Sequence, residues 1–223
     1  MPDSTGKIPV MVLSLDNVIV DGDSLTKLAS SLRSYGLRHG KLRLVKRIYT
    51  LSSRRNNQDI SHRRFKFELI RTLRNLKKPE FIDHFAQKVA DSFKPEVKRL
   101  MDKFKSEGGK VAVVTAAPSE YAVQIANKIG ADHIIATPSL SEFRRKYPHD
   151  PIDYEECAGH EKISRLEEWL EKINGYIHTV VSGEPDELPL ILLPDIDSIF
   201  IASNSKSMRR TLKRQAIFFE TIH

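Results

Sequence analysis

The sequence predicts an α/β fold in which a Rossmann-like, doubly wound parallel sheet carries an inserted all-helical cap domain. Two observations lead to this fold class. After about residue 93, short β-branched runs alternate with amphipathic stretches, which is typical of parallel strands joined by crossover helices. Between residues 21 and 92, apolar residues recur at helical spacing. We therefore expect residues 1–20 and 93–223 to form the α/β core and residues 21–92 to form the cap.

Strands are expected where short apolar runs rich in β-branched residues occur. The run IPVMVLSL at residues 8–15 has polar flanks and suits a strand that is buried on both faces. Five further strands are predicted at residues 110–115, 131–137, 176–181, 198–202 and 216–219. Helices between them are predicted at residues 120–129 and 163–173, where apolar residues return every three or four positions.

The charge of the chain is concentrated in the predicted cap. Residues 27–78 contain sixteen Lys and Arg against two acids, a net charge of +14, whereas the whole chain carries +7 and the remainder therefore −7. We interpret this basic block as a solvated cap surface that also attracts phosphorylated ligands. Nucleic acid and an anionic membrane surface are alternative partners, although few aromatic residues are available for stacking on bases.

The sequence also limits the cellular setting. No apolar run approaches the roughly 20 residues that a transmembrane helix needs. The first seven residues lack the charged-then-apolar pattern of a signal peptide. The single cysteine, Cys157, excludes an intrachain disulfide and fits a reducing compartment. We therefore expect a cytoplasmic protein without a transmembrane segment.

Polar residues follow several predicted strands. Ser14 and Asp16 lie at the end of the first strand, Thr115 ends the second, and an acidic stretch at residues 183–187 follows the fourth. Lys162 lies near the start of the helix that precedes the fourth strand. Because ligands of such sheets bind beyond the carboxyl ends of the strands, these groups should converge on one point. A lysine, hydroxyls and carboxylates together could hold a phosphoryl group.

These four segments resemble, in order, the motifs of the haloacid dehalogenase (HAD) superfamily, most closely its phosphoserine-phosphatase-like branch with a helical cap after the first motif. The family's first motif is a strand followed by D-x-D-G-T, and here that slot is SLDNV at residues 14–18. TAAP at residues 115–118 is similar to the second motif, and CAGHEK, ending at Lys162, to the third. GEPDELPLI at residues 183–191 is similar to the fourth motif, which carries two acids four residues apart.

The resemblance implies a role for each matching residue. Asp16 takes the position of the general acid and base, whose backbone carbonyl also binds Mg²⁺. Thr115, Ala116 and Lys162 take the positions that bind the phosphoryl group. Glu187 takes the position of the second acid of the fourth motif, which leaves it and Asp16 as the remaining metal ligands.

Two departures from the family pattern change the expected chemistry. Ser14 replaces the aspartate that attacks phosphorus, and a serine hydroxyl is a poor nucleophile without an activating base. Gly183 replaces a metal-binding acid, so Mg²⁺ is expected to bind weakly or not at all.

The sequence therefore favours a pseudophosphatase that keeps a phosphate-binding cleft, with a phosphorylated small molecule or an unidentified protein as its partner. One alternative is an active but atypical phosphomonoester hydrolase. Another is a polyanion-binding module that acts through the basic cap.

Overall fold

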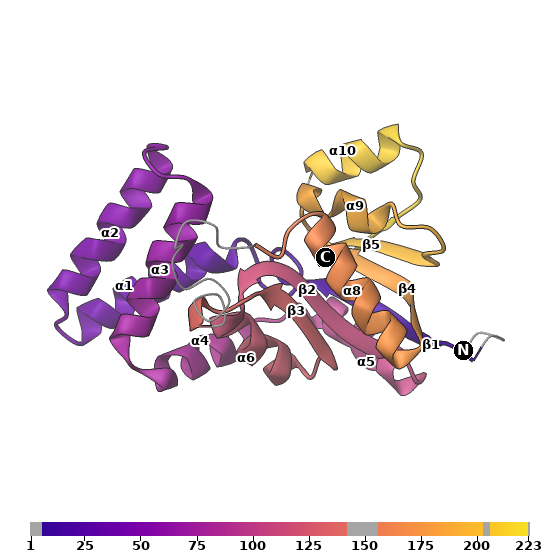
Figure 1. Cartoon of the computed structure of the whole chain (residues 1–223), viewed down its shortest axis with the longest axis horizontal. Helices are drawn as coiled ribbons and strands as arrows, with labels where there is room; N and C mark the ends of the chain where they lie inside the picture. Colours follow the sequence, from indigo (N-terminus) through magenta and orange to yellow (C-terminus); the bar gives the residue numbers. More distant parts are fainter. Residues whose placement is uncertain (1–5, 142–155, 203–205, 223) are drawn as a thin grey trace.

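A computed structural model describes residues 6–141, 156–202 and 206–222. Its centre is a six-stranded sheet in the order β3-β2-β1-β4-β5-β6, and every neighbouring pair of strands is parallel. The strands are β1 (Ile8–Ser14), β2 (Lys110–Pro118), β3 (His133–Thr137), β4 (Gly175–Ser182), β5 (Ser198–Ala202) and β6 (Glu220–Ile222). The predicted α/β class with a Rossmann-like parallel sheet is confirmed (Figure 1).

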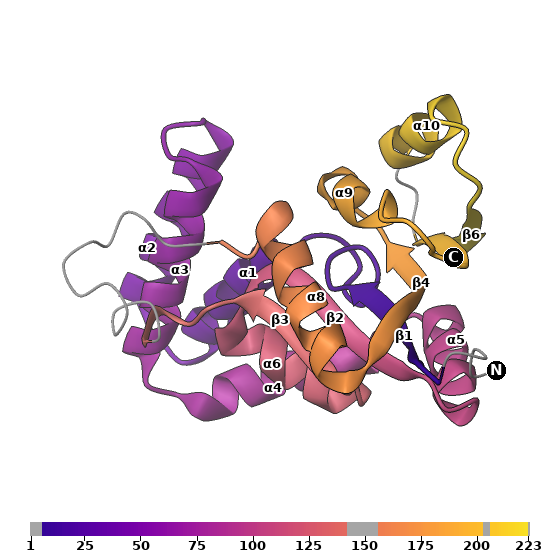
Figure 2. The same cartoon turned by 45° about the vertical axis from the view of Figure 1, so that its right-hand side comes forward.

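Helices cover both faces of this sheet, because successive side chains of a strand point to opposite faces. Met11 and Leu13 of β1 join a hydrophobic cluster with helices α1–α6, whereas Val10 and Val12 join a second cluster with α8–α10. The helix α8 therefore lies on the face opposite α5 and α6 (Figure 2). In the described residues the helices are α1 (Ser24–Arg38), α2 (Leu42–Asn56), α3 (His62–Leu76), α4 (Pro79–Asp91), α5 (Pro95–Ser106), α6 (Ser119–Ile129), α8 (His160–Ile173), α9 (Leu188–Ile191) and α10 (Lys206–Arg214), with a 3-10 turn at Pro185–Glu187.

The segment between β1 and α5 forms the four helices α1–α4, as its apolar spacing predicts. The side chain of Asp23 caps α1 by accepting a hydrogen bond from the backbone N–H of Thr26, and Ser61 caps α3 in the same way. The helix α4 begins at Pro79, where the missing N–H costs no helical hydrogen bond.

The helices α1–α3 lie together at the left of Figure 1, beyond the edge of the sheet. By contrast, α4 packs against α6 of the α/β core, and the Phe85 and Tyr121 rings meet edge to face with their centroids 5.7 Å apart. Since α4 shares one hydrophobic cluster with both α1 and α6, the division at residue 92 stays a prediction.

The last strand was predicted in the wrong place. It runs over residues 220–222 and not over 216–219. The reason is the turn that ends α10: Ala216 has a φ of +56°, and the N–H of Ile217 still bonds to the carbonyl of Leu212. A left-handed residue within this helix-ending turn cannot be part of a strand.

Among the described residues, no helix combines the length and the apolar character that crossing a membrane requires.

Candidate phosphate-binding site

Three hydroxyl-bearing residues mark the carboxyl edge of the three central strands. Ser14 ends β1 beside Val114 of β2, so Thr115 is the next residue along β2. Leu13 pairs with Val181, so Ser182 follows on β4 at the level of Ser14. Ser14, Thr115 and Ser182 are all buried, between 0% and 3% exposed. The sheet thus places the predicted Ser14 and Thr115 at one edge, as the parallel topology requires.

Asp16 lies just beyond this edge and is held by the start of α1. Its Oδ1 accepts a hydrogen bond of 2.7 Å from the backbone N–H of Ser24. Burial raises the pKa of Asp16 to about 6, because the hydrogen bonding from Ser24 that favours the carboxylate offsets desolvation only in part and the charges of Asp23 and Glu187 add to it. A carboxyl group with this pKa is partly protonated near pH 6.

Asn17 keeps the backbone shape that the family's glycine would provide. Its φ is +61°, in the left-handed region that glycine adopts freely and that asparagine tolerates best among the other residues. The Asn17 amide Nδ2 also donates a hydrogen bond to Oε1 of Glu184. The Asn17 side chain therefore links the turn after β1 to the segment after β4.

Glu184 belongs to the acidic stretch at residues 183–187 that the sequence places after the fourth strand, and it is half-buried. Burial, together with the negative charges of Asp186, Asp16 and Glu187, raises its pKa from 4.5 to about 7. Two carboxyl groups of this region, those of Asp16 and Glu184, thus titrate within about two units of neutral pH.

Thr115 and Ala116 lie at the centre of a small hydrogen-bond network. The Thr115 hydroxyl accepts a bond of 3.0 Å from the N–H of Ala117, which leaves its own proton available to an acceptor. The Ala116 carbonyl accepts from the Thr137 hydroxyl at 2.7 Å. That hydroxyl in turn accepts from the N–H of Cys157 at 3.1 Å, so it joins β2 to the turn before α8.

Lys66 is a residue near the site that sequence reasoning missed. It projects from α3, is 3% exposed, and donates to the carbonyl of Ala116 at 2.9 Å. Its Nζ also forms an ion pair of 2.9 Å with Oε1 of Glu156. A usable signal was present: Lys66 lies three and four residues before Leu69 and Ile70, on the apolar stripe of α3, and a lysine on such a stripe needs a buried partner.

Lys162 of α8 and Glu187, in the 3-10 turn after β4, form a buried ion pair. Lys162 lies in the first turn of α8, which begins after Gly159, a residue with a φ of +55°. The Lys162 Nζ is 3.5 Å from Oε1 of Glu187 and 3.6 Å from Oδ2 of the exposed Asp186. Burial alone would lower the pKa of Lys162, but the two carboxylates outweigh it and the pKa is raised.

The remaining oxygen of Glu187 is also engaged. Its Oε2 accepts from the Ser182 hydroxyl at 2.7 Å and from the N–H of Gly183 at 3.4 Å. Gly183 offers only backbone atoms at the position of the lost acid. In the residues that the structure covers, no three His, Cys, Asp or Glu side chains gather closely enough to hold one metal ion. The side chains of Ser14 and Gly183 supply no carboxylate oxygen to a metal ion, and both oxygens of Glu187 are already engaged.

The parallel α/β sheet carries hydroxyls, a buried lysine and carboxyls near its carboxyl edge, where ligands of such sheets bind. The chain belongs to the haloacid dehalogenase-like hydrolase family, whose model matches residues 12–187. Phosphatases of this family typically use Mg²⁺. The four motifs of the sequence lie within the matched residues, apart from the last few positions of the fourth.

Solved structures share this fold. A protein of unknown function from Bordetella pertussis Tohama I is 17% identical, with a TM-score of 0.73 over 97% of this chain and 99% of that chain. A phosphoserine phosphohydrolase-like protein from Francisella tularensis is 13% identical, with a TM-score of 0.55 over 96% and 95%. A HAD family hydrolase from Salmonella enterica serovar Typhi is 10% identical, with a TM-score of 0.54 over 96% and 66%. No curated protein matches the sequence. Identities this low show the fold alone.

Proposed function

We propose that this HAD-family protein binds a phosphorylated ligand but does not hydrolyse it through an aspartyl-phosphate intermediate. The observation that carries the proposal is the contrast between the two halves of the site. The side chains expected to hold a phosphoryl group, Thr115 and Lys162, are present and buried at the carboxyl edge. The groups expected to perform chemistry are replaced at Ser14 and Gly183.

The substitution at Ser14 removes both the nucleophile and a negative charge. A serine hydroxyl attacks phosphorus only when a base takes its proton, and the ester so formed lacks the reactivity of an acyl phosphate. It also supplies no anionic oxygen to a metal ion.

The contacts of Glu187 weaken the case for a metal further. Its two oxygens already face the Lys162 ammonium, the Ser182 hydroxyl and the Gly183 N–H. Turning this carboxylate toward Mg²⁺ would leave Lys162 buried with only Asp186 as a partner, which is unfavourable. Without a metal, only the lysines of the site offset the repulsion between its acids and a phosphate dianion.

The retained groups suit binding. The Thr115 hydroxyl can donate its proton to a phosphoryl oxygen, since it already accepts from Ala117. The Lys162 ammonium can supply positive charge at the start of α8. Lys66 adds a second buried cation next to Ala116, brought in by the helical insert. A ligand with a phosphoryl group at this edge would therefore meet two cations and a hydroxyl donor.

The test is Mg²⁺-dependent phosphate release by the purified protein over a broad panel of phosphomonoesters, with Asp16→Ala as the control variant. We expect no release above that control. Binding of phosphomonoesters, measured by calorimetry, should weaken in Thr115→Val. Release that is abolished by Asp16→Ala would contradict the proposal and would identify an active site that works without the family nucleophile.

An active but atypical hydrolase is the second candidate, and the titration of two carboxyls favours it. With pKa values of about 6 and about 7, Asp16 and Glu184 could serve as acid and base at neutral pH. In that case Glu184→Gln should abolish phosphate release and remove one limb of the pH profile. Persistent release in Glu184→Gln would exclude this role for Glu184.

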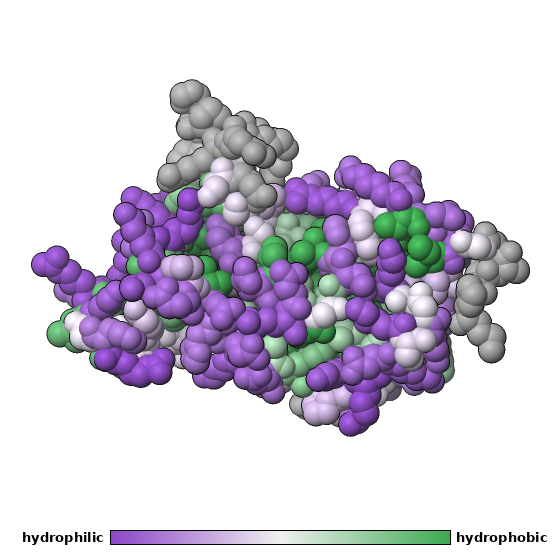
Figure 3. All heavy atoms as spheres, turned by 90° about the horizontal axis from the view of Figure 1, so that it is seen from below, coloured by the Kyte–Doolittle hydropathy of each residue, from purple (hydrophilic) through white to green (hydrophobic). Residues whose placement is uncertain are grey.

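The outward face of α2 favours a third candidate, binding to an anionic membrane surface. Leu42 and Tyr49 are 70% and 66% exposed, and they share this face with Lys46 because residues three and four apart are neighbours on a helix. Arg43 and Arg54 are exposed nearby. Figure 3, which views the molecule from below, shows mostly hydrophilic residues at the end that carries these helices.

On an anionic membrane, exposed apolar side chains insert into the lipid and the neighbouring cations are attracted to the head groups. On a nucleic acid, the cations are attracted to the phosphates, but the apolar side chains gain little from the phosphodiester backbone. Co-sedimentation with phosphatidylserine vesicles tests this candidate. Binding should weaken with salt and in Leu42→Glu. Equal binding to RNA, unchanged in Leu42→Glu, would favour nucleic acid instead.

A further inference from the structure

The helices α1 and α4 enclose a cavity that the phosphate-binding site does not use. Its volume is about 280 Å³, close to the lower end of the roughly 300–1,000 Å³ that is typical of small-molecule sites. The lining residues come from the last three turns of α1, the residue after it, and α4. None of them is a residue of the candidate phosphate-binding site.

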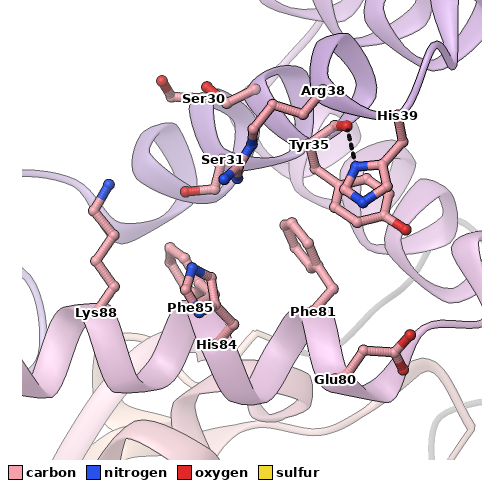
Figure 4. Close-up of a pocket in the computed structure, with 11 residues that line it drawn as sticks. Ser30, Ser31, Tyr35, Arg38, His39, Glu80, Phe81, His84, Phe85 and Lys88 are labelled. Atoms are coloured by element: carbon pink, nitrogen blue, oxygen red, sulfur yellow. Dashed lines mark hydrogen bonds between the residues drawn. The ribbon is translucent and has the colours of Figure 1, made fainter.

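Three aromatic rings form the floor of this cavity. Phe81 and Phe85 are 6% and 3% exposed, and in Figure 4 both point from α4 toward α1. Tyr35 of α1 meets Phe81 edge to face, with ring centroids 5.3 Å apart. The ring of His39 stacks on Tyr35, and the Lys41 Nζ lies 5.3 Å from the centroid of the Tyr35 ring. A flat apolar group can lie against such rings with favourable contacts.

Basic side chains surround the floor. Arg38 extends from α1 toward α4, and Lys88 extends from α4 toward α1 (Figure 4). Within the described part of the chain, neither of them forms an ion pair. His39 and His84 lie on the same rim, and its acid, Glu80, is paired with Lys78 at 3.3 Å. The rim is therefore positive, with two cations that pair with no acid among the described residues.

We propose that the cavity between α1 and α4 binds a small organic anion with a flat apolar body, such as an aromatic carboxylate. The body lies on Tyr35, Phe81 and Phe85, and the anionic group lies between Arg38 and Lys88. The size of the cavity excludes a peptide helix, and the two cations select an anion over a neutral molecule of the same shape. This inference is independent of whether the protein turns over phosphate.

The test compares 2-naphthoate with its neutral analogue 2-naphthamide by calorimetry on the full chain. 2-Naphthoate should bind about tenfold more tightly, since each charge-assisted contact contributes to affinity. The double variant Arg38→Gln/Lys88→Gln should lose that preference. The matched control Lys98→Gln/Arg99→Gln also removes one lysine and one arginine charge, but from the exposed face of α5. It should keep the preference for 2-naphthoate.

Two further variants locate the ligand. Ser31→Trp leaves both cations in place, fills the cavity from α1, and should abolish binding of both compounds. Thr115→Val alters the phosphate-binding site and should leave 2-naphthoate binding unchanged. Equal affinity for the acid and the amide would overturn the proposal. So would unchanged binding in Ser31→Trp, or loss of binding in Thr115→Val.

Discussion

The ammonium group of Lys162 lies 3.5 Å from Oε1 of Glu187, and both residues are only 4% exposed. A buried pair of this kind gives little net stability, because desolvation offsets most of the attraction. Its members nevertheless depend on each other, since a charge left alone in the interior is costly. The pair therefore fixes the orientation of Lys162 at the start of α8, and it does so with an acid that the family would otherwise offer to a metal.

Removing Lys162 should expose this dependence. We expect Lys162→Met to lower the free energy of unfolding by about 3 kcal/mol, as is usual when one member of a buried pair is deleted. Urea unfolding provides the measurement. The control Asp186→Asn removes a partner whose side chain is 58% exposed and should cost less than about 0.5 kcal/mol.

The double variant Lys162→Met/Glu187→Gln separates the pair from its surroundings. It should be more stable than the sum of the two single losses predicts, because no buried charge is left without its partner. Strictly additive losses would contradict the coupling.

The raised pKa of Glu184 predicts a dependence of stability on pH. In the folded protein its pKa is about 7, above the ordinary value of 4.5, so the folded state binds more protons than the unfolded state between these pH values. The contribution of Glu184 to the free energy of unfolding is therefore fully present below about pH 4.5 and is lost as the pH rises through about 7.

Glu184→Gln removes the charge and keeps an oxygen that can accept from Asn17. We expect its Tm to exceed that of the wild type by about 2 °C at pH 8.5, with the gain reduced because Glu184 is only half-buried. At pH 5 the difference should disappear. Thermal unfolding at both pH values checks this, with the exposed Glu171→Gln as the control that should show no pH-dependent difference. A gain of equal size at pH 5 would contradict the linkage.

The conformation of Asn17 predicts which substitutions the first motif tolerates. Asn17→Gly and Asn17→Ala both remove the amide that donates to Glu184. The difference in stability between the two variants therefore reports the cost of the backbone conformation alone. Because φ is +61°, the alanine variant should be less stable than the glycine variant by about 1 kcal/mol. Chemical unfolding of the two variants gives this difference directly. If alanine were the more stable, the left-handed turn after Asp16 would be wrong.

Lys66 should hold α3 against the core. In Lys66→Met, the bond to the Ala116 carbonyl and the ion pair with Glu156 are both lost. We expect amide hydrogen exchange in α3 to become about tenfold faster, as the loss of a charged hydrogen bond implies. Arg74→Met removes an exposed cation from the same helix and is the control. Equal acceleration in both variants would mean that Lys66 has no special role.

The fold was predictable because it depends on patterns that individual residues carry. The buried run at residues 8–14 and the helical spacing of residues 21–92 are consequences of local periodicity, and both reappear in the structure. The position of β6 was not predictable from periodicity, since it depends on how far the turn at Ala216 extends α10.

The site was predictable only where a motif carries it. The ordered motifs identify Asp16, Thr115, Lys162 and Glu187, although their roles stay predictions. Lys66 lies fifty residues before the carbonyl that it contacts, so no local spacing relates the two. The contact between Asn17 and Glu184 likewise joins residues 167 positions apart, and only the parallel order of β1 and β4 brings them together.

Restoring the two lost acids is the strictest test of the alignment on which the proposed function rests. Ser14 and Ser182 lie at the same level on neighbouring strands, and Gly183 follows Ser182. Ser14→Asp and Gly183→Asp together would therefore place two carboxylates at one edge, beside the backbone of Asp16. Hard oxygen ligands in this number are what Mg²⁺ requires. We expect the double variant to bind Mg²⁺ at least about tenfold more tightly than the wild type in a calorimetric titration.

The matched control for that variant is Ser14→Asn/Gly183→Asn, which introduces side chains of nearly the same size without charge. It should show no gain, because neutral amides cannot replace the anionic ligands. A gain in the control would mean that altered packing, not coordination, changes the affinity. No gain in the aspartate variant, with its fold intact by circular dichroism, would mean that Ser14 and Gly183 do not occupy the metal-ligand positions. The proposed absence of turnover could then not rest on these two substitutions.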